Sequence, residues 1–242
     1  MTETEALFLS LVVVVVLVAA HISASSLRPE RWITTEAWRS LAGGVGCGYV
    51  FVFVLPELAA HQAQLTPDAP LTMREREVFL TALLGLAAYY GIEAVTRDEG
   101  PDMGPLRHRG FWVHMAGFGV YNAIVGFVLA ERPANGPGEI LAYGGALALH
   151  FFANDHHFMN RYDGPYQRHG RWVLSVATIG GWALGVALPG AGGVAGFLFA
   201  FLAGGMILNI LKQELPSGTK SRFWAFALGV AAYAIVGVIH GR

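Results

Sequence analysis

Seven polar residues crowd into one otherwise apolar stretch of the chain. The stretch begins at Ala146 as ALALHFFANDHHFMNRY and carries His150, Asn154, Asp155, His156, His157, Asn160 and Arg161. Imidazoles and carboxylates suit borderline divalent metals such as Zn²⁺, Fe²⁺, Mn²⁺ or Ni²⁺. Ionisable groups inside a membrane span are costly unless they face a cavity or each other, so the stretch indicates a functional site.

Helical geometry selects which of these residues can act together. His150, Asn154 and His157 recur at i, i+4 and i+7 and share one face of a helix. Asp155 lies about 100° from Asn154 around the helix, so it joins this face only if the helix is distorted near its end. The preceding apolar segment carries two further candidates, His114 and Asn122.

Antiparallel packing of these two segments would bring His114 towards His157 and Asn122 towards His150. We therefore expect a cytoplasm-facing polar cavity that binds a divalent ion weakly, through ligands drawn from His150, Asn154, His157, His114, Asn122 and Asp155. Neutral imidazoles bind metal, so binding is expected to weaken as the pH falls through about 6.5, where free histidine becomes protonated.

Plainer interpretations stay open for the same residues. His150 could instead form a hydrogen bond to a neighbouring helix. The set His156, His157, Asn160 and Arg161 could lie in the inner headgroup region, where polar groups cost little. His21 and His61 are expected at the membrane interface, and Cys47 is expected to pack within its glycine-rich segment. Solvated caps at span ends are the simplest interpretation of Glu57, Glu93 and Glu214.

The composition is that of a membrane protein. Of the 242 residues, 54% are hydrophobic and only 14% are charged, whereas soluble domains carry roughly 25% charged residues. A net charge of −1 gives no indication of nucleic-acid binding, and a single cysteine excludes an internal disulfide. The chain is expected to form a single polytopic domain over residues 1–242.

Eight apolar segments approach the roughly 20 residues that a membrane-spanning helix needs. The first begins acidic and is too long for a signal-peptide core, so we expect it to be retained. The segments cover approximately Ala6–Leu27, Thr35–Ala60, Val78–Val95, Phe111–Ala130, Glu139–Met159, Arg171–Leu188, Gly193–Leu211 and Phe223–His240.

Basic residues in the loops orient these segments. With the N-terminus outside, the outer side holds only Arg74, Arg76, Arg132 and Arg242. The inner side holds twelve basic residues: Arg28, Arg31, Arg39, Arg97, Arg107, Arg109, Arg161, Arg168, Arg171, Lys212, Lys220 and Arg222. Because cytoplasmic loops carry the excess of Lys and Arg, we expect eight spans with both termini outside the cytoplasm.

Several segments, in order, resemble the ZIP family of divalent-metal transporters. The second reads GYVFVFVLPELAAH, the third GLAAYYGIEAV, the sixth VATIGGWALGVAL and the seventh FLAGGMILNILKQELP. The resemblance implies an all-α membrane protein, an eight-helix ZIP-like bundle with extracytoplasmic termini. It further implies that the chain transports a metal ion and is not an enzyme.

The chain departs from the family pattern at the metal site. Of the expected fifth-helix ligands only His150 is present, because Phe151 and Asn154 stand in place of two glutamates. In the fourth helix, Gly117-Phe118 and Tyr121-Asn122 stand in place of the family's ligand pairs. The resemblance therefore implies a divalent transition-metal ion, with zinc as the leading candidate, that is held weakly or not at all. The alternative is a non-transporting ZIP-like protein that acts as a metal sensor or partner scaffold.

A third interpretation, a membrane di-iron enzyme, would need about eight histidines in several boxes, and the histidines here are scattered. The expected partners are the metal-ion substrate and the lipid bilayer, with no nucleic acid. The oligomeric state stays open, a homodimer included. The expected location is a plasma membrane of the bacterial inner-membrane type.

The loop charges generate the first testable prediction. A reporter that is active only outside the cytoplasm, fused after Arg242, is expected to be active because both termini lie outside. The measurement is reporter activity in intact cells. Activity of a cytoplasm-specific reporter at the same junction would contradict the predicted topology.

Overall fold

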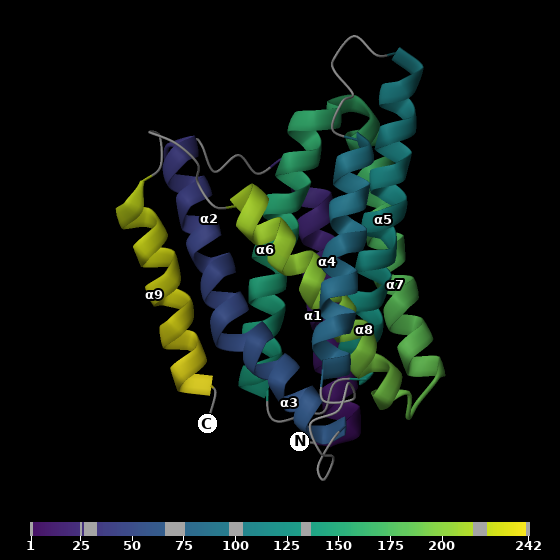
Figure 1. Ribbon diagram of the computed structural model, residues 1–242, viewed down its shortest axis with the longest axis vertical. Helices are drawn as coiled ribbons and strands as arrows, with labels where there is room; N and C mark the ends of the chain where they lie inside the picture. Colours follow the sequence, from purple (N-terminus) through teal and green to yellow (C-terminus); the bar gives the residue numbers. More distant parts are fainter. Residues whose placement is uncertain are drawn as a thin grey trace.

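The computed structural model describes residues 2–24, 26, 33–65, 76–96, 104–131, 137–214 and 222–240, all of which form helices or the short segments beside them. The helices run roughly along the long axis of the molecule (Figure 1). They are α1 Glu3–Ser23, α2 Thr35–Tyr49, η2 Val50–Val54, α3 Leu55–Leu65, α4 Glu77–Thr96, α5 Gly104–Glu131, α6 Pro137–Pro165, η4 Tyr166–Gly170, α7 Arg171–Ala187, α8 Gly192–Asn209, η5 Ile210–Glu214 and α9 Phe223–His240.

Each predicted apolar segment corresponds to helix in the described part of the chain. The second segment contains a wide turn, η2, just before Pro56. Proline lacks an N–H group and its ring crowds the carbonyl four residues earlier, which accounts for the local change of helical pitch. The fifth segment stays helical beyond its polar end, as far as Pro165, although Asp163 departs from helical geometry with a φ of 26°.

Side-chain caps define where two helices begin. Thr2 caps α1: its hydroxyl accepts from the Glu5 N–H at 3.2 Å, while the Glu5 carboxylate accepts from the Thr2 N–H at 2.8 Å. Thr34 caps α2 by accepting from the Ala37 N–H at 3.3 Å. The bonds are reciprocal at Thr2 and single at Thr34, and they satisfy N–H groups that have no partner within the helix.

Three helix pairs pack with their backbones nearly touching: α2 with α9, α4 with α8, and α5 with α7. A Cβ atom on Gly181 of α7 would lie 1.8 Å from the Ala123 carbonyl oxygen of α5, and one on Gly126 would lie 2.1 Å from the Thr178 carbonyl oxygen. The other two pairs have the same kind of contact, at Gly44, Gly229, Gly85 and Gly204. Small residues thus permit the close packing that membrane helices use.

The surface is apolar where these helices face outward. Val15 of α1, Leu84 of α4 and Val238 of α9 are each more than half exposed, while polar side chains such as Asp155 and His21 are buried. Five helices of the described residues are long and apolar enough to cross a membrane: Glu3–Ser23, Thr35–Ala63, Glu77–Thr96, Arg109–Glu131 and Gly192–Lys212. The chain is thus an α-helical protein suited to a membrane.

The start of α1 and the end of α9 lie at the same end of the molecule, the lower end in Figure 1. This agrees with an even number of passes through the bundle. Several residues used to predict the orientation and the first segment's end lie outside the described residues, namely Leu27, Arg28, Arg31, Arg74, Arg97, Arg132, Lys220 and Arg242.

Two adjacent glycines of α7 test the close packing. Gly181→Val is expected to destabilise the protein by about 3 kcal/mol or more, because the new side chain would enter the backbone of α5. Gly180→Val is the matched control, since a Cβ there meets nothing within 4 Å. The measurement is thermal unfolding of the purified protein in detergent, and equal effects of the two substitutions would contradict the packing.

Candidate functional site

A carboxylate and an imidazole form a buried pair inside the bundle. Asp155 of α6 is 0% exposed and His21 of α1 is 1% exposed, and Asp155 Oδ2 lies 2.8 Å from His21 Nδ1. Burying an ionisable group costs several kcal/mol unless it is paired and hydrogen-bonded. The pair therefore constrains how α1 and α6 pack.

The amide of Asn122, on α5, fixes the protonation of the imidazole. Its Nδ2 donates to the Phe118 carbonyl at 2.8 Å, so its Oδ1 faces His21 Nε2, 2.9 Å away. An amide oxygen only accepts, which requires Nε2 to carry a hydrogen. The remaining nitrogen, Nδ1, then shares one proton with the Asp155 carboxylate.

Two hydroxyl groups complete the set. Tyr166 of η4 donates to Asp155 Oδ1. The single hydroxyl hydrogen of Thr178 of α7 is within reach of Asn122 Oδ1, 3.0 Å away, and of the Leu174 carbonyl of its own helix, 2.9 Å away. The close approach of α5 and α7 at Gly126 and Gly181 brings Thr178 within reach of Asn122. Five elements thus converge on one polar centre, which we call the central cluster: His21, Asn122, Asp155, Tyr166 and Thr178.

The first helix turns His21 inward. The buried face of α1 carries Ser10, Val14, Leu17 and His21, which recur at helical spacing. The Ser10 hydroxyl accepts a hydrogen bond from the side-chain N–H of Trp182 of α7 at 2.9 Å. This bond holds the same face of α1 against the bundle nearer the N-terminus of the helix. The sequence predicts His21 at the membrane interface; the structure shows that its side chain faces the interior of the bundle, where it is 1% exposed. Ser10 and His21 are eleven residues apart, which is three helical turns. This spacing of two polar residues is the sequence pattern that indicates a shared buried face.

The predicted ligands do not all converge. The expectation that Asn122 faces His150 is wrong, because Asn122 is hydrogen-bonded to His21. The neighbouring Tyr121 faces His150 instead, with its hydroxyl 3.4 Å from His150 Nε2. The backbones of α5 and α6 make few close contacts. Long aromatic side chains bridge them instead, as where Phe118 meets Phe158 with ring centroids 4.7 Å apart.

Three other predicted residues occupy the face of α6 that geometry indicated. His150 and Asn154 are buried, 3% and 8% exposed, and His157 is half-buried with no hydrogen-bond partner at Nε2. Asp155 points away from that face, to His21, without any distortion of the helix near it. The carboxylate therefore belongs to the central cluster and not to the histidine face.

A second polar cluster joins the end of α4 to α5, α6 and η5. Glu93 Oε2 lies 3.5 Å from His114 Nε2, and Glu93 Oε1 lies 3.1 Å from Lys212 Nζ and 3.8 Å from Arg161 Nη1. His114 Nδ1 lies 2.6 Å from the Tyr162 hydroxyl. Glu93 is 17% exposed, so the expectation of a solvated cap is wrong: the carboxylate links α4 to its neighbours.

The second cluster is poorly suited to a free cation. Lys212 and Arg161 already compensate the charge of Glu93, and a divalent ion there would meet both. Among the described residues, no three His, Cys, Asp or Glu side chains lie close enough to hold one metal ion.

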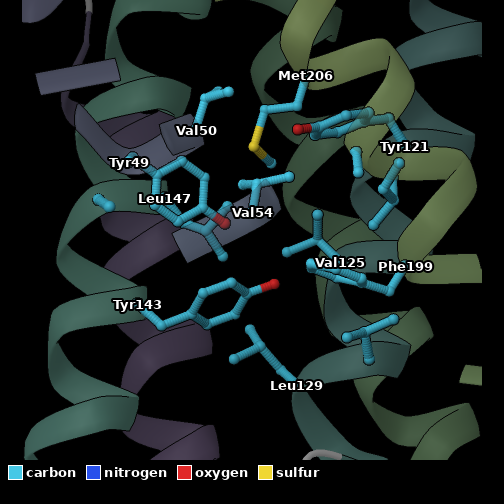
Figure 2. Packing of buried hydrophobic residues seen from close by; sticks show 14 of the residues in the cluster. Tyr49, Val50, Val54, Tyr121, Val125, Leu129, Tyr143, Leu147, Phe199 and Met206 are labelled. Atoms are coloured by element: carbon cyan, nitrogen blue, oxygen red, sulfur yellow. The ribbon is translucent and has the colours of Figure 1, made fainter. Parts of the chain in front are cut away.

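The opposite half of the bundle interior is apolar. Tyr143 of α6 and Leu129 of α5 face one another below Val125 and Leu147 in Figure 2, which also shows Tyr49 and Val54 of the second helical segment. The Tyr49 and Tyr143 rings lie 6.2 Å apart, and the Phe53 and Tyr143 rings 5.1 Å apart. A packed apolar core therefore fills much of this half, together with the uncharged polar side chains of Ser10 and Gln62.

No family model matches the chain, and no curated protein matches it.

The buried pair gives a prediction about stability. Asp155→Ala is expected to destabilise the protein by about 3–5 kcal/mol, because it leaves the imidazole of His21 without its buried partner. The double variant His21→Leu/Asp155→Leu removes both members and is expected to recover at least half of that loss. Thermal unfolding in detergent measures both effects, and a double variant less stable than Asp155→Ala would contradict the coupling.

Proposed function

We propose that the chain is an integral membrane protein that transports a divalent transition-metal ion through a ZIP-like bundle of eight helices. All eight predicted segments are helical within the described residues, and five of the helices meet the length and hydropathy of a membrane span. In the proposed orientation both termini are extracytoplasmic, and the protein resides in a plasma membrane of the bacterial inner-membrane type.

The observation that carries the proposal is the buried carboxylate of Asp155. It contacts His21 of α1 and Tyr166 of η4 in a bundle whose outward surface is apolar. A charged group within a span is expensive, and hydrogen bonds between membrane helices can be formed by uncharged side chains at lower cost. A carboxylate kept in this position is best explained by an ion that binds there.

The division of the interior supports a path with one closed end. The polar half contains the central cluster and the second cluster, near the N-terminal half of α5 and the C-terminal half of α6. In the proposed orientation this half faces the cytoplasm, and the apolar half around Tyr143 and Leu129 faces outside (Figure 2). The resting form is then sealed on the outer side.

A second candidate function is a metal sensor or partner scaffold that does not transport. One observation favours it: several predicted ligands are already engaged by the protein, Asn122 and Asp155 by His21, and His114 by Tyr162. An ion must displace some of these bonds to bind. Bound metal without flux would favour this alternative over transport.

Transport is tested by Zn²⁺ flux into proteoliposomes loaded with a zinc-sensitive dye. The parent is expected to give protein-dependent flux, and Asp155→Asn is expected to reduce it at least ten-fold because the amide removes the buried negative charge. Asp163→Asn is the matched control, because it makes the same chemical change on the same helix at an exposed residue. The Asp163 side chain accepts a hydrogen bond from Gln167. It is expected to leave the flux unchanged.

Two results would count against the proposal. Flux no greater than that of empty liposomes excludes Zn²⁺ transport, and retention of Asp155-dependent metal in the same preparation then selects the sensor. Equal flux in the parent and Asp155→Asn places the ion path elsewhere in the bundle.

A further inference from the structure

We infer that His21, on the first helix, is a ligand of the transported ion and binds it through Nδ1 beside the Asp155 carboxylate. This inference rests on the proposed function and names a residue that lies 134 positions from Asp155 in the chain. The sequence-predicted ligand set contained no residue of the first helix.

The hydrogen bonds around the ring leave Nδ1 as the nitrogen for an ion. Nε2 carries a hydrogen, which it donates to Asn122 Oδ1, and that oxygen is fixed because the amide Nδ2 donates to the Phe118 carbonyl. Metal-binding histidines characteristically donate their second N–H to such a partner, which fixes the tautomer and the ring orientation. Asn122 is thus an orienting residue for His21, and its predicted role as a ligand is replaced.

The two donor atoms lie close enough to share one small ion after a limited separation. Nδ1 and Oδ2 are 2.8 Å apart with one shared proton between them. Two ligands of a tetrahedral Zn²⁺ with bonds of about 2.0–2.1 Å are separated by roughly 3.3 Å. A shift of about half an ångström therefore admits the ion, which takes the place of the shared proton; that proton leaves to solvent.

The surrounding side chains hold both donors in place. The Phe151 ring stacks on the imidazole with centroids 4.9 Å apart and planes 23° apart. Tyr166 donates a hydrogen bond to the second carboxylate oxygen, Asp155 Oδ1. The Tyr166 hydroxyl oxygen therefore borders the central cluster. An imidazole with a carboxylate favours Zn²⁺, Fe²⁺ or Mn²⁺ over Mg²⁺ and Ca²⁺, which prefer sets of oxygen ligands.

The test compares His21→Gln with His150→Gln, the same substitution at two buried histidines that are 1% and 3% exposed. Cu²⁺ is the probe, because pulsed EPR detects the nitrogen of a coordinated imidazole. Only the imidazole signal that is present in the parent and absent from Asp155→Asn is counted. This excludes Cu²⁺ ions bound to surface histidines. His21→Gln is expected to lose this imidazole signal and to bind Cu²⁺ at least ten-fold more weakly, whereas His150→Gln keeps both.

Asn122→Ala provides an independent variant should His21→Gln fail to fold. It is expected to keep the imidazole signal and weaken Cu²⁺ binding by about 10–100-fold, the usual effect of removing an orienting partner. Unchanged affinity in Asn122→Ala would overturn the inference.

The remaining outcomes separate this inference from the proposed function. An imidazole signal unchanged in His21→Gln, in a protein whose parent carries Zn²⁺ flux, overturns the role of His21 and leaves transport standing. An Asp155-dependent signal that requires His21 but is accompanied by no flux supports the ligand and rejects transport. Absence of both the Asp155-dependent signal and flux in the parent rejects both.

Discussion

The buried pair of Asp155 and His21 is the interaction on which the arrangement of the bundle depends. A carboxylate that is 0% exposed requires a partner of matching chemistry, and the first helix supplies it from its last turn. The pair thereby fixes the rotation of α1 and its packing against α6. Tyr166 and Asn122 extend the same constraint to η4 and α5.

Close packing elsewhere serves this centre. Where α5 and α7 approach at Gly126 and Gly181, the Thr178 hydroxyl reaches the Asn122 amide. The second cluster around Glu93 connects the end of α4 to the helices that hold the central cluster, with its charge compensated by Lys212 and Arg161. Apolar packing around Tyr143 fills much of the other half of the interior, while the buried histidines His21, His114 and His150 and the Asp155 carboxylate lie together on one side.

The helical segments could be predicted from the sequence because length and hydropathy decide where a chain can cross a membrane. Helical spacing also placed His150, Asn154 and His157 on one face, as the structure has them. The partners of Asp155 could not be predicted, since they lie on helices whose order around the centre no local pattern specifies. For His21 the local signal is its eleven-residue spacing from Ser10, since the valines, leucines and alanines between them do not distinguish one face of α1 from another.

The roles of the candidate metal ligands therefore depend on contacts between helices that are distant in the sequence. The direct measurement is an anomalous difference map at the zinc edge, from crystals of the full chain grown with Zn²⁺. The account predicts one peak within the bundle, at bonding distance of about 2.0–2.2 Å from Asp155 Oδ2 and His21 Nδ1. A peak bound by His150 and His157 with His21 still paired to Asp155, or no peak within the bundle, would contradict it.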